Sequence, residues 1–256
     1  MTLPRFFCQN DLAAALEQSQ PICLDKTLAH YMQRVLRLAD LSQVVLFNGQ
    51  GGEYVATLHY KGKNLSAKLL QFANIERELP WSISIAQGLA TGDKMDWICE
   101  KSVEMGAAAL IPIAAKHSTL KLSGERLEKR LAHWQRIAQA ASEQCGRNRL
   151  LTVAPLQTIS SLLQTINQNT TDDTLLLFCD PDATQDFPAA IRQAAEINNS
   201  HWVLLIGPEG GWSEQEKKMA LDAGAISMRF GSRVLRTETA AIALLGAIRG
   251  QLAWIA

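Results

Sequence analysis

The sequence carries no net charge and few aromatic residues. Its 25 Lys and Arg balance 25 Asp and Glu, and aromatic side chains make up 6% of its 256 residues. A neutral chain has no overall attraction for a polyanion, although local patches can still have one. The hydrophobic share of 47% is enough for a large buried core, which makes disorder, a coiled coil or a small disulfide scaffold poor descriptions. One large domain or two smaller ones fit the length.

Cysteines are sparse, and long apolar runs are missing. The five cysteines are odd in number and scattered, without a C-x-x-C pair: Cys8, Cys23, Cys99, Cys145 and Cys179. This pattern favours reduced thiols over a disulfide framework or a zinc site, and we expect no metal. The apolar runs fall short of the roughly 20 residues that span a bilayer, and the first residues do not resemble a secretion signal. We therefore expect a cytoplasmic protein with no membrane partner.

Charge is segregated along the chain although the total is zero. Residues 116–149 hold eight Lys and Arg against three Asp and Glu, whereas residues 150–200 hold one basic and six acidic residues. Within 124–145 apolar residues recur every three or four positions, which predicts an amphipathic helix. The free face of this helix would carry Arg126, Lys129, Arg130, His133 and Arg136. Such a patch suits a polyanion, but an ordinary solvated helix face explains it about as well.

Two kinds of pattern divide the chain. Between residues 44 and 70, short β-like runs alternate with Gly and Asn turns, which is typical of β-hairpins. Beyond Pro80 strand-like and helical segments alternate: strands at 82–87, 109–113, 175–179, 202–206 and 225–230, and helices at 93–106, 124–145, 189–197, 214–223 and 239–255. This alternation predicts a mainly parallel sheet covered by helices. We therefore expect a small, mostly β domain at 1–74 and an α/β domain at 75–256.

A glycine-rich loop, 207–211, follows the predicted strand that ends at Ile206. A capping box of Ser213 and Glu216 then signals the start of a helix. Loops at the carboxyl ends of parallel strands bind ligands in open α/β sheets, and glycines let the backbone approach a ligand closely. The loop matches neither the dinucleotide nor the Walker pattern, and Glu209 would repel a phosphate. An adenosyl-type ligand fits better, while a tight connection without a ligand is the alternative.

A second junction of strand, loop and helix lies at 230–241. Arg233, Arg236 and Glu238 lie together in it. Helix capping by Thr237 and a surface ion pair would explain these polar residues. They would not explain why both glycine-bearing loops follow predicted strands. The helix after this loop, 240–248, is apolar on nearly every side, so we expect it to be deeply buried or to pack against a second copy of the chain.

These two loops resemble those of a known family, the ribosomal small-subunit methyltransferase E group of the SPOUT, or α/β-knot, methyltransferases. The similarity runs nearly the full length and is strongest at 207–213 with Glu216 and at 231–240. Supporting stretches lie at 92–96, 100–106, 134–138, 143–147 and 4–7, and at His30 with 34–37.

The resemblance implies a fold and an activity. The fold would be α/β, with a small PUA-like β-barrel followed by a trefoil-knotted, Rossmann-like SPOUT domain. The activity would be methylation, by S-adenosylmethionine, of N3 of one uridine in 16S ribosomal RNA, position 1498 in the usual ribosomal numbering. The 30S subunit would be the partner, and the knotted domain would form a homodimer. Since the methyl donor is an activated sulfonium, the protein has mainly to align the reactants and remove the N3 proton.

Individual site residues are hypotheses placed beside this resemblance. We expect the cofactor to be held by Leu177, Gly207, Pro208, Glu209, Gly210, Gly211, Leu235, Arg236, Thr239 and Ala240. Arg236 is the leading candidate to hold uracil and stabilise its imide anion. Glu238 and Glu143 are candidates for the base, although capping or ion pairing explains each of them at least as well. We expect RNA to be bound by Arg5, His30, Arg34, Arg37, Arg130, Arg136 and Arg147.

Two alternatives stay open. The same fold and cofactor could serve a ribose 2′-hydroxyl or a transfer RNA base, because these acceptors need similar alignment. A non-catalytic RNA-binding assembly factor would explain the basic patch and the β domain, but the two loops would then have no function.

Overall fold

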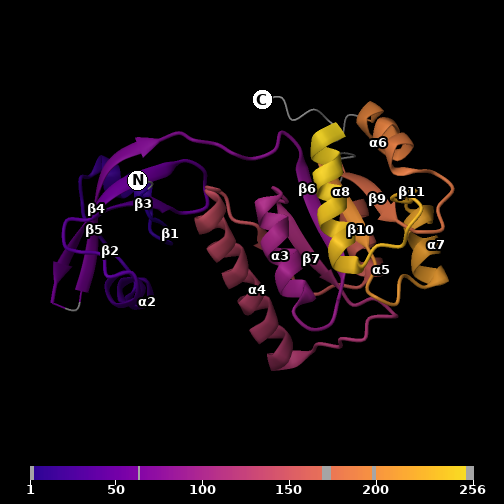
Figure 1. The fold of residues 1–256 in the computed structure, drawn as a ribbon, viewed down its shortest axis with the longest axis horizontal. Helices are drawn as coiled ribbons and strands as arrows, with labels where there is room; N and C mark the ends of the chain where they lie inside the picture. Colours follow the sequence, from indigo (N-terminus) through magenta and orange to yellow (C-terminus); the bar gives the residue numbers. More distant parts are fainter. Residues whose placement is uncertain (1–2, 63, 169–173, 198–199, 252–256) are drawn as a thin grey trace. The chain divides into compact units, whose positions relative to one another are not determined.

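The chain forms two compact units in the computed structural model, which describes residues 3–62, 64–168, 174–197 and 200–251 (Figure 1). The first unit comprises residues 1–78 together with 142–150, and the second comprises 79–141 with 151–256. That residues 142–150 belong with the first unit was not predicted from the sequence. The domain boundary near residue 74 stays a prediction.

The first unit is built on a five-stranded mixed sheet with the order β1-β3-β4-β5-β2. Strands β3 (Gln43–Phe47), β4 (Glu53–Lys61) and β5 (Asn64–Ala73) pair antiparallel and confirm the predicted hairpins. Strand β1 (Arg5–Phe7) pairs parallel with β3, and β2 (Ile22–Cys23) pairs antiparallel with β5. Two short helices, α1 (Leu12–Glu17) and α2 (Lys26–His30), and a π-helical turn, η1 (Tyr31–Val35), complete the unit. These short elements were missed because too few residues define their period.

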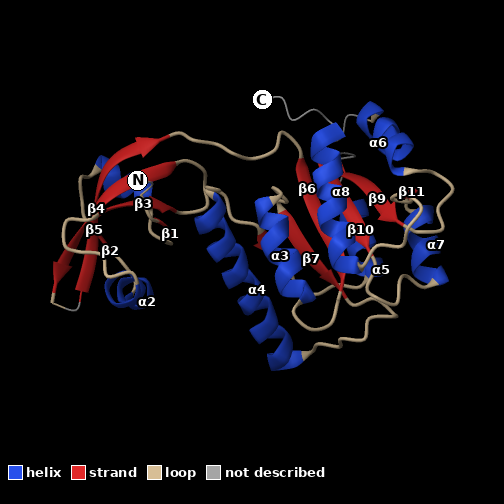
Figure 2. Cartoon of the chain, viewed as in Figure 1, coloured by secondary structure: helices blue, strands red, loops and turns tan. Residues whose placement is uncertain are grey.

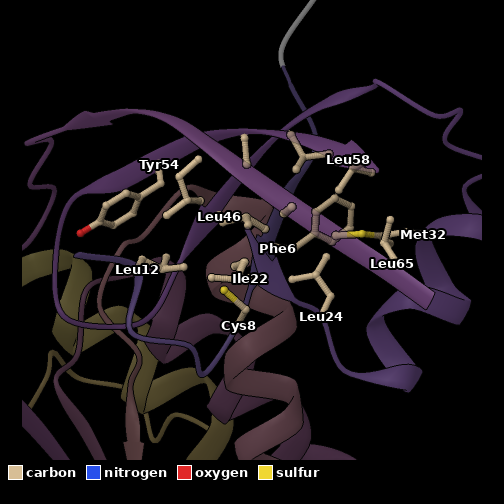
Figure 3. Packing of buried hydrophobic residues seen from close by; sticks show 14 of the residues in the cluster. Phe6, Cys8, Leu12, Ile22, Leu24, Met32, Leu46, Tyr54, Leu58 and Leu65 are labelled. Atoms are coloured by element: carbon tan, nitrogen blue, oxygen red, sulfur yellow. The ribbon is translucent and has the colours of Figure 1, made fainter. Parts of the chain in front are cut away.

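Alternate residues of β4 and β5 form the core of the first unit. Figure 3 shows Phe6, Leu46, Leu58 and Leu65 from the strands packed together with Met32 from η1. Fully burying a side chain of this size contributes roughly 1.5–3 kcal/mol. The unit therefore has a hydrophobic core of its own.

The second unit is built on a six-stranded sheet with the order β11-β9-β10-β6-β7-β8, and its strands pair in parallel throughout. The strands are β6 (Ser82–Gly88), β7 (Ala109–Ile113), β8 (Thr152–Val153), β9 (Thr174–Cys179), β10 (His201–Ile206) and β11 (Ile226–Met228). The central strands are buried along almost their whole length, as expected when both faces of a parallel sheet are covered. The predicted parallel sheet is confirmed.

Helices cover this sheet (Figure 2). They are α3 (Lys94–Glu104), α4 (Gly124–Cys145), α5 (Ile159–Gln168), α6 (Phe187–Glu196), α7 (Glu214–Asp222) and α8 (Thr237–Gln251). Helices α5 and α7 pack together over one face, and α3 packs against α8. The predicted helices are confirmed, except that α5 was missed and that residues 252–255 of the last prediction lie outside the described part. No helix among the described residues is long and apolar enough to cross a bilayer.

Two helices differ in how they begin. Asp93 precedes α3, but its side chain makes no capping hydrogen bond. Its ψ of 5° lies far from the extended backbone that an N-cap residue adopts, so the carboxylate is not aimed at the free N–H groups. The capping box of Ser213 and Glu216 on α7 is confirmed in both directions.

The last part of the chain returns from the edge of the sheet to its centre. Strand β11 lies at the edge, next to β9, whereas α8 packs against α3 and β10. Residues 229–236 make this crossing. They bring Thr237 beside the loop that follows β10.

Candidate functional site

A cavity of about 600 Å³ lies at the carboxyl ends of β9 and β10. Its wall is formed by the end of β9 with the residues after it, 178–182, by the end of β10 with its loop, 206–212, and by 234–238 at the start of α8. Lys94, Glu214, Lys217 and Ala240 complete the wall. The volume falls within the roughly 300–1,000 Å³ range of small-molecule sites. The two loops that the sequence singled out therefore form one site.

Most residues predicted to hold the cofactor line this cavity, namely Gly207, Pro208, Glu209, Gly210, Gly211, Leu235, Arg236 and Ala240. Leu177 does not, because it is fully buried within β9 and the lining begins one residue later, at Phe178. Thr239 is exposed on the first turn of α8 and also lies outside the lining. What each residue binds stays a prediction.

Glycines allow the close packing of this loop. A Cβ atom on Gly88, at the end of β6, would lie 2.5 Å from Cδ of Pro208. A Cβ atom on Gly210 would lie 2.9 Å from the carbonyl oxygen of His117. Gly211 has a φ of +69°, a conformation that costs little only for glycine. The loop is thus held against two neighbouring segments that leave no room for side chains.

Thr237 joins three segments of the site. Its hydroxyl donates to the carbonyl oxygen of Gly207 at 2.5 Å and accepts a hydrogen bond from Nε2 of Gln87 at 2.7 Å. The same Nε2 donates to the carbonyl of Gly88 at 3.0 Å. From the sequence, Thr237 was predicted only as a helix cap, and Gln87 was not predicted. The available signal was an amide side chain near the carboxyl end of a predicted strand.

Glu209 is tied to the start of α3. Its Oε1 accepts hydrogen bonds from the Thr91 amide at 2.9 Å, the Thr91 hydroxyl at 2.8 Å and Nζ of Lys94 at 2.7 Å. Burial alone would raise the pKa of Glu209, but the bonds from Lys94 and Thr91 outweigh it and lower the pKa to about 2. The carboxylate is therefore charged, and it fixes the glycine loop against the Thr91 segment.

Carboxylates outnumber cations in the cavity wall. Five acidic residues, Asp180, Asp182, Glu209, Glu214 and Glu238, line it together with Lys94, Lys217 and Arg236. Asp180 is buried and pairs with Lys217 at 2.5 Å, a hydrogen bond that raises the pKa of Lys217. Among the described residues, no hydrogen-bond partner faces the buried Nε1 of Trp212, a donor, or the buried Oε2 of Glu238, an acceptor. The cavity thus suits a ligand with positive charge and hydrogen-bonding groups.

The three predicted catalytic residues are not all in one place. Arg236 and Glu238 line the cavity from the turn that begins α8. Glu143 is not part of the lining. It belongs to the end of α4 that forms part of the first unit, where its Oε1 accepts the Phe7 N–H at 3.0 Å.

The predicted RNA-binding residues separate into exposed and buried ones. The side chains of His30, Arg34, Arg37 and Arg136 are exposed, and Arg130 is partly buried with its guanidinium 3.8 Å from Asp96. Arg5 is bonded to Glu53 and to Oδ1 of Asn148. Arg147 is buried and donates to both carboxylate oxygens of Glu78.

The sequence resembles known families in both of its units. Residues 77–249 match the RNA methyltransferase domain, and residues 24–70 match the RNA methyltransferase PUA domain. The ribosomal RNA small subunit methyltransferase E of Bacillus subtilis is 29% identical over 92% of each chain. Fold and site together therefore define a two-domain RNA methyltransferase.

Solved structures agree with this assignment. A methyltransferase from Legionella pneumophila in complex with the cofactor S-adenosylmethionine has a TM-score of 0.85 at 26% identity, over 98% of each chain. The ribosomal RNA small subunit methyltransferase E from Neisseria gonorrhoeae bound to S-adenosylmethionine has a TM-score of 0.83 at 30% identity, over 97% of this chain and 98% of that one. The chain belongs to the ribosomal RNA small subunit methyltransferase E family. The predicted fold class, a PUA-like unit with a SPOUT α/β unit, is confirmed.

Proposed function

We propose that the protein transfers the methyl group of S-adenosylmethionine to N3 of one uridine in 16S ribosomal RNA, the base numbered 1498 in the usual ribosomal numbering. One observation carries the proposal: the cavity at the ends of β9 and β10 combines an acidic, glycine-walled pocket with Arg236 and Glu238. Membership of a family named for this RNA supports the choice of substrate.

The donor set of the cavity fits S-adenosylmethionine. The cofactor carries positive charge on its sulfonium and its ammonium group, and the wall holds five carboxylates against three cations. Opposite charges attract each other more strongly in a partly buried site than in water. The unpartnered Nε1 of Trp212 supplies a donor for a polar group of the ligand. When bound, the cofactor supplies a methyl group that is already activated for transfer.

The chain's own residues would then position the acceptor and move a proton. Uracil N3 becomes nucleophilic when it loses its proton, and the resulting imide anion needs a positive partner. Arg236 lines the cavity and can hold that anion through a charge-assisted hydrogen bond. Oε2 of Glu238 is buried in the same wall with no hydrogen-bond partner in the part of the chain that the structure describes, which favours Glu238 over Glu143 as the group that accepts the N3 proton.

RNA would be bound by exposed cations of both units. His30, Arg34 and Arg37 in the first unit and Arg136 on α4 are exposed. Arg5 and Arg147 are paired with carboxylates inside the first unit, so we assign them to its stability. We further propose a cytoplasmic enzyme that acts on the 30S subunit as a homodimer. Val234 supports the dimer, since this cavity residue is 79% exposed and a second copy would cover it.

The test is to incubate the protein with S-adenosylmethionine and 30S subunits that lack the modification, digest the RNA and identify methylated nucleosides by mass spectrometry. We expect 3-methyluridine at one position, and an Arg236→Ala variant that binds the cofactor but methylates at least 100-fold more slowly, about 2.7 kcal/mol of transition-state stabilisation. A 2′-O-methylated nucleoside would overturn the proposed acceptor. Absence of both methylation and cofactor binding would favour a non-catalytic RNA-binding protein.

A further inference from the structure

The first unit exposes apolar side chains between two arginines. Tyr31 is 43% exposed, Val35 59% and Leu36 39%. Arg34 and Arg37, which flank Val35 and Leu36 in the sequence, are exposed as well. Three neighbouring apolar side chains are therefore exposed to water together, which is typical of a binding surface.

The π-helical turn η1 puts these apolar side chains on one side. The Leu36 N–H donates to the carbonyl of Tyr31 at 3.0 Å, so Leu36 stands one wide turn beyond Tyr31 and Val35 adjoins it. Met32 points the other way, into the core of the unit (Figure 3). The Tyr31 ring meets the ring of Phe6 edge-on, with 6.3 Å between centroids and 80° between planes. A buried neighbour thus orients an exposed aromatic ring.

Arg37 holds a strained backbone conformation at the end of the turn. Its φ is +53°, in the left-handed region that favours glycine. The following Leu38 N–H closes the turn by donating to the carbonyl of Met32 at 3.0 Å. Glycine would fit this position with less strain, yet the chain has arginine there. Strained positions and π-helical turns concentrate at functional sites, where the side chain is needed in spite of its backbone.

Cations prevail along the turn. Residues 26–39 include Lys26, Arg34 and Arg37 and contain no Asp or Glu. The carboxylates just beyond the two ends of this range, Asp25 and Asp40, accept hydrogen bonds from backbone N–H groups. A surface with cations, an aromatic ring and apolar side chains is complementary to single-stranded nucleic acid. Phosphates pair with the cations there while an unpaired base stacks on the ring.

We propose that Tyr31, Val35 and Leu36, here called the stacking turn, receive an unpaired base of the RNA substrate, while Arg34 and Arg37 bind the phosphates beside it. The assignment rests on the proposed function for the identity of the ligand, which is an RNA. The stacking turn would give the protein a preference for single-stranded over duplex RNA. A duplex keeps its bases stacked inside, so it offers the stacking turn only its backbone.

The test compares variants of the full chain in binding to a fluorescent single-stranded oligouridine and to an RNA duplex of the same length. Tyr31→Ala is expected to weaken single-strand binding about tenfold, because stacking on an aromatic ring is lost, and to change duplex binding much less. Tyr31→Phe should bind like the parent protein. Val35→Ser changes a more exposed side chain, so it tests the stacking turn even if Tyr31→Ala unfolds. Leu70→Ser is the matched control, since Leu70 is 47% exposed on β5 of the same unit.

Arg37→Gly separates binding from stability. Glycine should relieve the strained φ, so the melting temperature should stay the same or rise. Single-strand affinity should fall, and its logarithm should depend on the logarithm of the salt concentration with a slope smaller by about 0.7. A variant that is both less stable and unimpaired in RNA binding would show that Arg37 is structural and would overturn its assignment.

Parallel measurements distinguish this proposal from the proposed function. If the parent protein methylates 30S subunits and Tyr31→Ala binds single strands unchanged, the stacking turn is wrong and the function stands. If no methylation occurs but Tyr31→Ala and Val35→Ser lose single-strand binding, the stacking turn stands and the function falls. If both variants instead shift the sedimentation of the protein from dimer to monomer, the surface belongs to a second copy and the proposal is overturned.

Discussion

The side-chain amide of Gln87 donates a 2.7 Å hydrogen bond to the hydroxyl of Thr237, which itself donates to the carbonyl of Gly207. This contact links the end of β6 to the first residue of α8 and to the loop after β10. Gln87 and Thr237 are both buried. Two walls of the cavity are therefore held in place by one hydroxyl group.

Thr237→Val tests this link, because valine keeps the shape of threonine and lacks the hydroxyl. The change removes two hydrogen bonds but leaves Gln87 Nε2 near the carbonyls of Gly88 at 3.0 Å and Gly207 at 3.4 Å. A lost hydrogen bond of this kind costs about 0.5–1.5 kcal/mol. We expect the dissociation constant for S-adenosylmethionine to rise about tenfold, measured by isothermal titration calorimetry. Thr237→Ser keeps the hydroxyl and should bind nearly as well as the parent protein. Equal affinities for the valine and serine variants would contradict the role of the hydroxyl.

The ion pair of Glu209 predicts a specific acid sensitivity. Burial in the folded protein would raise the pKa of Glu209. The hydrogen bonds from Lys94 and Thr91 outweigh this effect and lower the pKa from 4.5 to about 2. A lowered pKa means that the charged form stabilises the fold above pH 4.5 and that this contribution is lost as the pH falls towards 2. Glu209→Gln should therefore be less stable than the parent at neutral pH.

The two proteins should differ less as the pH approaches 2, which thermal melts at a series of pH values would measure. The expected difference at pH 7 is a few degrees in melting temperature. A constant difference from pH 7 to pH 2 would contradict the assigned ionisation of Glu209. Comparing the variant with the parent separates Glu209 from other carboxyl groups with lowered pKa, such as Glu53 and Glu76, which are present in both.

The sequence predicted the cavity loops because their chemistry is local. The glycines of 207–211 and the capping box of Ser213 and Glu216 are visible without tertiary structure, and alternating strands and helices predict where such loops meet. Gln87 was not predicted, because its importance comes from partners that are distant in the chain, one of them Thr237. Residue types alone likewise did not distinguish exposed arginines such as Arg136 from Arg147, whose partner Glu78 is far away in the sequence.

The close approach of β6 to the glycine loop predicts a strong effect of one added methyl group. In Gly88→Ala the new Cβ atom would lie 2.5 Å from Cδ and 2.6 Å from the backbone nitrogen of Pro208, so the loop must move. Overpacking of this kind costs about 1–3 kcal/mol. We expect a lower melting temperature together with weaker cofactor binding.

Gly250→Ala is the matched control for Gly88→Ala. Gly250 lies near the end of α8, and no described residue has an atom within 4 Å of a Cβ atom placed there. Alanine is the better helix former by roughly 0.5–1 kcal/mol, so this variant should be slightly more stable and should bind the cofactor normally. Normal cofactor binding by Gly88→Ala would contradict the inferred packing of the loop against β6.

Two arginines predicted to bind RNA should have opposite phenotypes. The side chain of Arg147 is 6% exposed and is paired with Glu78, so Arg147→Met leaves a carboxylate largely buried without its partner. Breaking a buried pair in this way costs about 3–5 kcal/mol, and we expect chemical denaturation to show a loss of that size.

Arg136 is exposed on α4, so Arg136→Ala should leave stability unchanged. It should instead reduce the salt dependence of RNA binding, by about 1 in the slope of log affinity against log salt concentration. If Arg147→Met were as stable as the parent and lost RNA affinity with the same change of slope, Arg147 would be a phosphate contact after all, and the first unit would have to expose it when RNA binds.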